Sequence, residues 1–375
     1  MMRKMVIEGE ESVSDLCFEA MVYVDRRYAY GSRVDTNMLC KIDMISGECE
    51  YVALFPSENT CGKRLHIKAA KYKEHIVFSP SVANNICIYN YVHNEFILIE
   101  LDACKARNKN VTLKYADIVM NGQYCYLIPA TYSQIIKIDM EKKEVVDRFC
   151  ISTDVKYNFR KDGVVVGDKY YISSANSNLV LELDMAQDVV KTHRVGKYNN
   201  GSWGMCYSDE VFWIIPYLAG AIVKWNPKTG EIKENLECYK VISDEEYMFM
   251  RGILIGTKIY AIPYYSKHLL VFDTKTEKME WIYINSDTGI EANVYLGSYE
   301  GDVYFLGSSK KIGWIDENLK RCFRWCIETN EIEECTFKIK MNKMEYLGEC
   351  FGCESGIVKE NEVVLQDFLE YIKGE

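Results

Sequence analysis

The sequence has no apolar run approaching the roughly 18 residues that a membrane-spanning helix needs. It also lacks runs of lysine and arginine, and its 55 acidic against 45 basic residues give a formal net charge of −10. Because phosphate backbones are held by basic surfaces, this balance argues against a nucleic-acid-binding protein. The first residues, MMRKMVIEGEESVSD, contain no apolar segment typical of a signal peptide. We therefore expect a cytoplasmic protein that binds neither membranes nor nucleic acids.

Histidine is scarce, with five residues, and no two histidines have the i, i+4 spacing of a helical zinc site. A phosphate-binding glycine loop, a nucleophile elbow and a dinucleotide fingerprint are also missing. The 15 cysteines are scattered and odd in number, so we expect reduced thiols that pack as small apolar side chains. Cys350 and Cys353 form a single CxxC, which indicates a zinc site only weakly and favours a structural role.

Proline is scarce too, but four of the six prolines recur at one place in a repeated pattern. Each stands ten residues before an Asp or Asn, as in AIPYYSKHLLVFD (261–273) and LIPATYSQIIKID (127–139). Three further segments keep the pattern without the proline. The Asp and Asn residues, called anchors below, are Asp43, Asn90, Asp139, Asp184, Asn226, Asp273 and Asp316. Their spacing of 42 to 49 residues is the length of one four-stranded propeller blade.

Each repeat is predicted to contain four strands, A to D. A Gly/Asp/Asn turn precedes a strand B rich in Tyr, Ile and Phe, and an apolar strand C runs into the anchor. A polar turn, as in NPKTGEIKE, then leads to strand D. Because proline cannot donate to a strand ladder, we expect it to end strand B. The anchor is expected to accept hydrogen bonds from backbone amides of the C–D turn.

This pattern resembles bacterial seven-bladed β-propellers, in the broad kelch-like and quinoprotein-like sense, over roughly residues 15–330. The resemblance implies an all-β fold of seven four-stranded antiparallel blades, closed into a ring that leaves no exposed sheet edges. Neither the Gly-Gly doublets of kelch repeats nor the Trp-Asp ending of WD repeats is present, so no named family is reached. The expected blades, within a propeller of residues 1–330, cover about 15–56, 63–102, 113–150, 158–196, 202–238, 248–285 and 292–328.

Residues 331–375 are expected to form an appendage that packs on the propeller. CTFKIKM (335–341) is compatible with an added strand. Apolar residues at helical spacing predict a short helix near the C-terminus, either packed or docking a partner, namely Val364, Leu365, Phe368, Leu369 and Ile372. The N-terminal KMVIEG is a candidate outer strand that latches the last blade to the first.

The resemblance implies that the D–A and B–C loops gather on one face around the central channel. The residues expected there are Arg64, His66, Tyr115, Arg160, Trp203 and Arg251 before strand A, and Tyr132, Tyr217, Tyr264 and Tyr265 after strand B. Arginine binds carboxylate or phosphate oxygens, and aromatic faces stack on sugar rings or apolar groups. We therefore favour a binding module without cofactor, for an anionic small molecule, a glycan or a peptide or protein partner. The alternative is that these side chains make blade-to-blade salt bridges and fill the channel.

A second hypothesis is a metal-dependent enzyme similar to propeller lactonases and lyases, which hold a divalent cation at the channel. Hard oxygen ligands suited to calcium or magnesium are Glu19, Asp117, Asp162, Glu291 and Asn293. The metal would polarise a carbonyl, and His66, the histidine on an expected channel lead-in, would act as base. The binding module remains the favoured interpretation.

Overall fold

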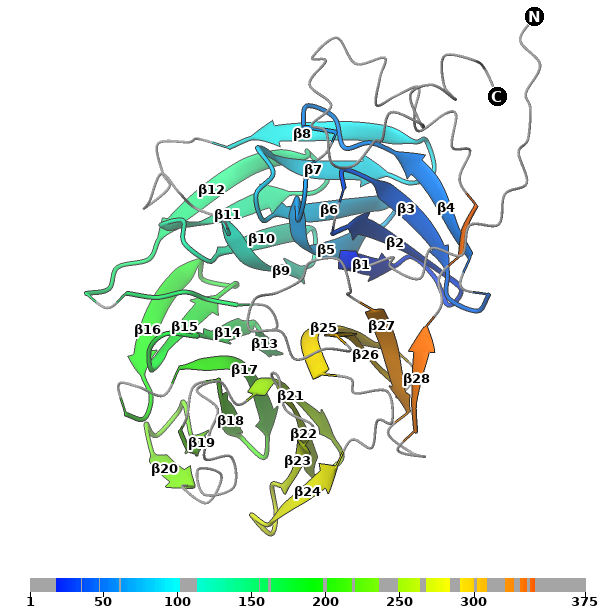
Figure 1. Ribbon diagram of the computed structural model, residues 1–375. Coiled ribbons are helices and arrows are strands. Elements are labelled where there is room, and N and C mark those ends of the chain that lie inside the picture. Colours follow the sequence, from blue (N-terminus) through cyan, green and yellow to red (C-terminus); the bar gives the residue numbers. More distant parts are fainter. Residues whose placement is uncertain are drawn as a thin grey trace, which may run out of the picture. The chain divides into compact units, whose positions relative to one another are not determined.

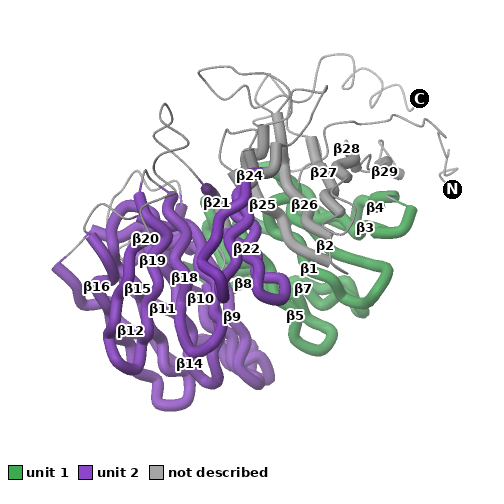
Figure 2. The backbone as a smooth tube through the Cα atoms, turned by 90° about the horizontal axis from the view of Figure 1, so that it is seen from below, with its two compact units in different colours: residues 1–101, 333–375 green, residues 102–332 purple. Residues whose placement is uncertain are grey.

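The computed structural model is all-β in its described part, with no helix there (Figure 1). The structure describes residues 18–34, 36–46, 48–60, 62–101, 113–154, 156–160, 163–197, 201–217, 220–235, 249–263, 268–283, 291–299, 302–308, 321–326, 331–335 and 338–340. These residues form seven sheets, each with the strands in the order A–B–C–D. The chain divides into two compact units (Figure 2).

Unit 1 comprises residues 1–101 and 333–375. Sheet 1 contains β1 (Phe18–Tyr23), β2 (Tyr28–Arg33), β3 (Leu39–Asp43) and β4 (Glu48–Ala53), with β29 (Lys338–Lys340) beside β4. Sheet 2 contains β5 (His66–Tyr72), β6 (His75–Pro80), β7 (Asn85–Asn90) and β8 (Glu95–Glu100). Strand A of sheet 1, β1, contacts strand A of sheet 2, β5.

Unit 2 comprises residues 102–332, and its last strand runs on to Cys335. Sheet 3 contains β9 (Tyr115–Asn121), β10 (Tyr124–Pro129), β11 (Gln134–Asp139) and β12 (Glu144–Cys150). Sheet 4 contains β13 (Val164–Val166), β14 (Lys169–Ser173), β15 (Leu179–Asp184) and β16 (Val189–Arg194). Sheet 5 contains β17 (Ser202–Ser208), β18 (Val211–Pro216), β19 (Ile222–Trp225) and β20 (Ile232–Asn235).

Sheets 6 and 7 complete unit 2. Sheet 6 contains β21 (Phe249–Ile255), β22 (Lys258–Pro263), β23 (His268–Asp273) and β24 (Met279–Tyr283). Sheet 7 contains β25 (Glu291–Tyr299), β26 (Asp302–Ser308), β27 (Arg321–Cys326) and β28 (Glu331–Cys335). Strand A of sheet 5, β17, contacts β13 and β21, and β21 contacts β25, so the A strands of sheets 4 to 7 are neighbours in succession.

The inner strands are buried on both faces because neighbouring sheets pack against each side of them. β6 and β18 read HIVFSP and VFWIIP, and their residues are almost all buried. In sheets 2 to 7 the D strands lie at the sheet edges, and β12 and β16 consist of exposed and half-buried residues. One core cluster joins sheets 3 and 4, with Tyr126, Ile128, Phe159 and Tyr170 among its buried members.

The prolines lie where the sequence predicts. β6, β10, β18 and β22 are four B strands that end at Pro80, Pro129, Pro216 and Pro263. Opposite the end of strand B, strand A carries a β-bulge in six of the sheets. The bulged residues, which the pairing register skips, are Glu19, Ile67, Ala116, Trp203, Met250 and Asn293.

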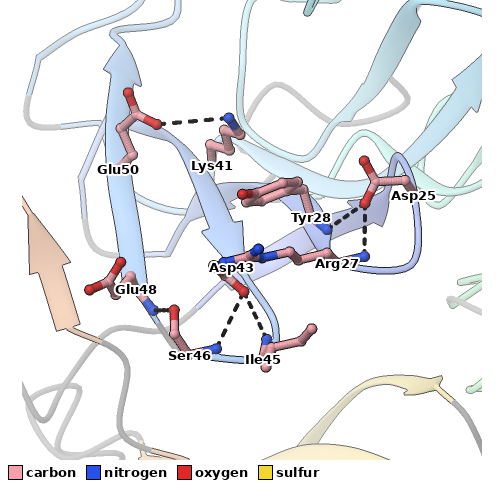
Figure 3. Close-up of polar contacts among 9 residues, drawn as sticks. All are labelled: Asp25, Arg27, Tyr28, Lys41, Asp43, Ile45, Ser46, Glu48 and Glu50. Carbon is pink, nitrogen blue, oxygen red and sulfur yellow. Dashed lines mark hydrogen bonds and ion pairs between the residues drawn. The ribbon is translucent and has the colours of Figure 1, made fainter.

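The anchors also do what the sequence predicts, at all six positions that the structure describes. In sheet 1, Asp43 Oδ1 accepts hydrogen bonds from the backbone amides of Ile45 at 3.0 Å and Ser46 at 3.3 Å (Figure 3). The same two bonds recur at Asn90, Asp139, Asp184, Asn226 and Asp273. The carboxylate of Asp43 also accepts from the Arg27 guanidinium, which holds the pKa of Asp43 far below its usual value.

The seventh repeat departs from the prediction. Asp316 lies outside the described residues, and strand C of sheet 7 is β27, which begins at Arg321. The prediction that strand C of this repeat ends at Asp316 is therefore wrong. The fourth strand, β28, runs to Cys335, inside the segment that we expected to be an appendage.

An added C-terminal strand is confirmed, and it joins the sheet formed by the N-terminal part of the chain. β29 pairs in parallel with β4, Ile339 opposite Cys49. Sheet 1 is thus built from both ends of the described chain. The proposed N-terminal latch KMVIEG and the helix predicted over residues 364–372 lie outside the described residues.

Ion pairs that recur at one repeat position join neighbouring sheets within unit 2. Lys137, two residues before its anchor, places Nζ 2.6 Å from Asp188 Oδ2 of the next sheet and over the Tyr126 ring. Lys224, at the same position in sheet 5, reaches Glu277 of sheet 6 at 3.2 Å and lies over the Trp213 ring. Both acids stand four residues after the anchors of their own sheets.

Replacing the anchor Asn226 by Ala should lower the free energy of unfolding by about 1 kcal/mol, because two turn amides lose their acceptor. Asn226→Asp keeps the Oδ1 acceptor that Asp139 uses in sheet 3, so its stability should stay near that of the wild type. Urea titration followed by circular dichroism measures both. Equal losses in the two variants would contradict the assigned role.

A double-mutant cycle between Lys137 and Asp188 should give a coupling energy of about 1 kcal/mol, because the pair is largely withdrawn from water. Lys137→Met keeps the apolar stem, and Asp188→Asn suits the positive φ of 56° at that position. The control pair is Lys228 and Glu210, which is exposed on both sides and should show no measurable coupling. An equally small coupling in both pairs would remove the proposed link between sheets 3 and 4.

Candidate functional site

Three of the residues predicted at the loop face lie together in unit 2: Arg160, Trp203 and Tyr217. The Arg160 guanidinium carbon lies 5.2 Å from the centre of the Trp203 ring, in a cation–π contact. The edge-on ring of Tyr217 is 4.9 Å from the same indole, at an interplanar angle of 81°. All three side chains are half-buried. We call these three residues the Arg–Trp–Tyr cluster.

The strand ends of sheets 4 and 5 position this cluster. Trp203 is the bulged residue of β17, between the pairs Ser202–Pro216 and Gly204–Ile215, and a bulge turns a side chain away from the regular pleat. Tyr217 directly follows Pro216, and its backbone amide donates to the Gly201 carbonyl at 2.9 Å. The proline and the bulge thus bring both rings to the same end of the sheet.

Ser174, in the B–C loop of sheet 4, holds the neighbouring loops to one another. Its carbonyl accepts from the Ser202 amide at 2.8 Å, and its Oγ accepts from the Asn158 amide at 3.1 Å. Gly201 passes so close to this loop that an added Cβ would lie 2.1 Å from the Ala175 carbonyl oxygen. The loops that carry Arg160 and Trp203 are therefore fixed by backbone contacts.

Arg64 and Glu19 pair with each other in unit 1. The guanidinium donates to both carboxylate oxygens, at 3.0 Å and 2.8 Å, from the lead-in of sheet 2 to the bulge of sheet 1. Glu19 is buried, whereas about half of the Arg64 side chain is exposed. Arg64, predicted to bind an anion, and Glu19, predicted to bind a metal, thus form a salt bridge between sheets. For Arg64 this is the alternative stated in the sequence analysis, a blade-to-blade salt bridge.

His66 lies in the core of unit 1. It is 2% exposed, its Nδ1 is 3.1 Å from Ser32 Oγ, and its ring is 4.2 Å from that of Phe55. Burial lowers the pKa of His66 to about 3, so the ring is neutral at pH 7. This surrounding suits a packed neutral histidine and gives a solvent-borne substrate no access to the ring.

Tyr115, Tyr132 and Asp117 are also buried. The two tyrosine rings pack against each other with centres 5.3 Å apart, and burial raises the pKa of Tyr115. Asp117 is 1% exposed and accepts hydrogen bonds from the Gly163 amide at 2.9 Å and from the Tyr170 hydroxyl at 2.8 Å. These contacts tie sheet 3 to the lead-in and second strand of sheet 4.

The remaining predicted residues are beyond the described structure. Tyr264, Tyr265, Asp162, Cys350 and Cys353 lie outside the described residues, as do the side chains of Arg251, Glu291 and Asn293. Within the described part of the chain no group of three or more His, Cys, Asp or Glu side chains is arranged to hold a metal ion. Of the six cysteines described as free of disulfides, Cys40, Cys49, Cys87, Cys125 and Cys206 are buried and Cys150 is exposed.

Three solved structures resemble the chain over most of its length. A catalytically inactive virginiamycin B lyase from Staphylococcus aureus matches 80% of this chain and 94% of its own, at 11% identity and a TM-score of 0.60. A streptogramin B lyase matches 79% and 92%, at 12% identity and 0.58. A putative 6-phosphogluconolactonase from Bacteroides fragilis matches 71% and 83%, at 12% identity and 0.52.

The fold is a β-propeller fold. This follows from the repeated four-stranded sheets together with these likenesses, which at such low identity carry the fold alone. No family model matches the chain, and no curated protein matches its sequence. The described residues contain no helix long and apolar enough to cross a membrane.

The burial of His66 predicts a loss of stability in mild acid. The unfolded histidine takes up a proton near pH 6.5, whereas the folded one does so only near pH 3. The stability that neutral His66 provides is therefore complete above pH 6.5 and is lost as the pH falls from about 6.5 to 3, by up to about 1.4 kcal/mol per pH unit. His66→Gln does not titrate, so its free energy of unfolding should fall less steeply over this range.

Urea titrations at pH 7, 6, 5 and 4 measure this slope. His93→Gln, the same substitution at an exposed histidine, is measured beside it as the matched variant. The same slope in wild type and His66→Gln would show that the buried ring does not set the acid sensitivity.

Proposed function

We propose that this β-propeller is a binding module whose seven sheets are the blades of one ring, and that it binds an anionic ligand at the Arg–Trp–Tyr cluster. The observation that carries the proposal is the half-buried Arg160 guanidinium stacked on Trp203, with Tyr217 against the same indole. A guanidinium gives planar, bidentate recognition of carboxylate or phosphate, and the adjacent rings offer an apolar face for the rest of a small molecule.

The charge distribution supports this location. Because the protein carries a formal net charge of −10, an anionic ligand must find a positive side chain at its site. At these loops the Arg160 guanidinium lies over the Trp203 ring. On this geometry we assign the ligand's negative charge to Arg160.

The metal-dependent enzyme receives less support. Its two candidate ligands with described side chains have protein partners, Glu19 in the salt bridge to Arg64 and Asp117 in hydrogen bonds to Gly163 and Tyr170. The similar structures include lyases and a putative lactonase, and also a protein of the mitotic checkpoint complex and U3-55K. The fold thus serves catalysis and assembly alike, and the cluster favours binding. We place the module in the cytoplasm, where its buried cysteines would stay reduced.

Titration calorimetry with citrate, galacturonate and tetraglutamate tests the binding role. At least one of these anions should bind, and Arg160→Ala should weaken that binding at least about tenfold, because a charge-assisted hydrogen-bond donor is removed. Arg194→Ala is the matched control, since Arg194 is an exposed arginine paired with Asp154 in the same sheet region. Undiminished affinity in a folded Arg160→Ala protein, or no binding of any of the three anions, would refute the proposal.

A further inference from the structure

Sheet 2 of unit 1 ends in a strand whose outer edge is unpaired. β8 is the last strand of that sheet, and Figure 1 shows it beyond β7. Among the described residues it pairs with β7 alone, from Asn85 opposite Glu100 to Asn90 opposite Glu95. Alternate residues of an edge strand direct their N–H and C=O groups away from the sheet, so the outer side of β8 is a template for one more strand.

The sequence of β8 differs from those of the other D strands. It reads EFILIE, and its four central residues are apolar and half-buried. Each of the other six D strands has a charged residue between its first and last residues. Charged side chains along an edge strand protect it from pairing with a further strand. The centre of β8 lacks this protection, and Phe96 and Leu98 hold the strand in place by packing against the core of unit 1.

Glutamates stand at both ends of this apolar run. Glu95 and Glu100 are exposed. In the part of the chain that the structure describes, neither carboxylate forms an ion pair or accepts a hydrogen bond. Opposite charges on directly facing residues of neighbouring strands stabilise their pairing. A strand laid beside β8 should therefore have a lysine or arginine opposite each of these two glutamates.

Sheet 1 shows that this chain already completes one acidic D strand in such a way. β29 pairs in parallel with β4, and the register puts Lys338 opposite Glu48 and Lys340 opposite Glu50. The apolar Ile339 lies between the two lysines in the sequence. A fifth strand with basic ends and an apolar centre is thus compatible with the edge of a D strand in this fold.

A second copy of β8 is a poor occupant for the edge. Antiparallel pairing in register would place Glu95 of one copy opposite Glu100 of the other. Parallel pairing in register would place each glutamate opposite its own counterpart. Because like charges directly opposite each other destabilise a sheet, the edge favours a different chain.

We propose that β8 is a docking site for an extended segment of a partner protein, which joins sheet 2 as a fifth strand through main-chain hydrogen bonds. The segment has an apolar centre and a lysine or arginine at each end of a six-residue stretch, matching the length of β8. β8 belongs to unit 1 and the Arg–Trp–Tyr cluster to unit 2, so this proposal is independent of the anion-binding function.

Fluorescence anisotropy with labelled hexapeptides and the whole protein tests the proposal. The peptide KIVIVK has basic ends and a strand-forming centre, and it should bind. EIVIVE should bind at least about tenfold more weakly, because its ends repel the two glutamates. KIVPVK keeps both lysines but contains a proline, which cannot donate to a ladder, and it should also bind at least about tenfold more weakly.

Charge reversal on the protein supplies the matched variants. The double variant Glu95→Lys, Glu100→Lys should bind EIVIVE more tightly than KIVIVK. Both glutamates are exposed, so the variant should keep its fold, which circular dichroism checks. Glu144→Lys reverses an exposed glutamate at the start of β12, the D strand of sheet 3, and should leave the preference for KIVIVK unchanged.

Four results would overturn the proposal. Equal affinity for KIVIVK and KIVPVK would show attraction between charges without strand addition. A preference for KIVIVK that survives in the double variant would place the binding elsewhere. Dimers of the free protein that the double variant loses, seen by analytical ultracentrifugation, would make a second copy the occupant. Absence of KIVIVK binding would show that the edge of β8 does not accept such a strand.

Discussion

The interaction on which the first six repeats depend is the hydrogen bonding of a short side chain to the turn that follows it. An Asp or Asn at the end of strand C accepts two amide hydrogen bonds, and this fixes the turn that brings strand D back beside strand C. Four residues after the anchor the chain has a positive φ, as at Asn94, Lys143 and Asp188. A left-handed residue there costs little compared with a mispaired hairpin, because a one-residue slip would turn the half-buried face of strand D outwards.

Once the hairpins are fixed, side chains at equivalent repeat positions join neighbouring sheets. Where the residue types at these positions change, another contact takes the place of the ion pair. Lys137 and Lys224, two residues before their anchors, pair with acids of the next sheet. In sheet 4 the residue two before the anchor is Glu182 instead of a lysine. In sheet 5 the residue four after the anchor is Gly230 instead of an acid, so this ion pair cannot form between sheets 4 and 5. The buried Glu182 instead binds Lys169 and His193 of its own sheet at 2.6 and 2.7 Å, and the His193 ring lies on Trp225 of sheet 5.

The spacing of a few residues was enough to predict the fold, whereas the side-chain environments at the loops were not predictable. Proline and the anchors act through the backbone of their own strand, so their positions along the chain locate strand ends directly. His66 and Tyr115 share a loop position with Arg160 in the repeat pattern, yet they point into the core. The direction in which these two side chains point depends on packing against a neighbouring sheet. That sheet is distant in sequence, so the residues around His66 and Tyr115 do not predict it. The seventh repeat failed because strand C follows Asp316 instead of preceding it.

The bulge in strand A shows how a repeat fold acquires one distinct site. At this position sheets 2 and 3 have Ile67 and Ala116, both buried, which serve packing alone. In sheet 1 the bulge presents Glu19, which is neutralised by Arg64 of the adjacent lead-in. In sheet 5 the bulge presents Trp203, and Arg160 of the adjacent lead-in lies on its ring. The same backbone device thus supports a salt bridge between sheets in one place and a guanidinium stacked on an indole ring in the other.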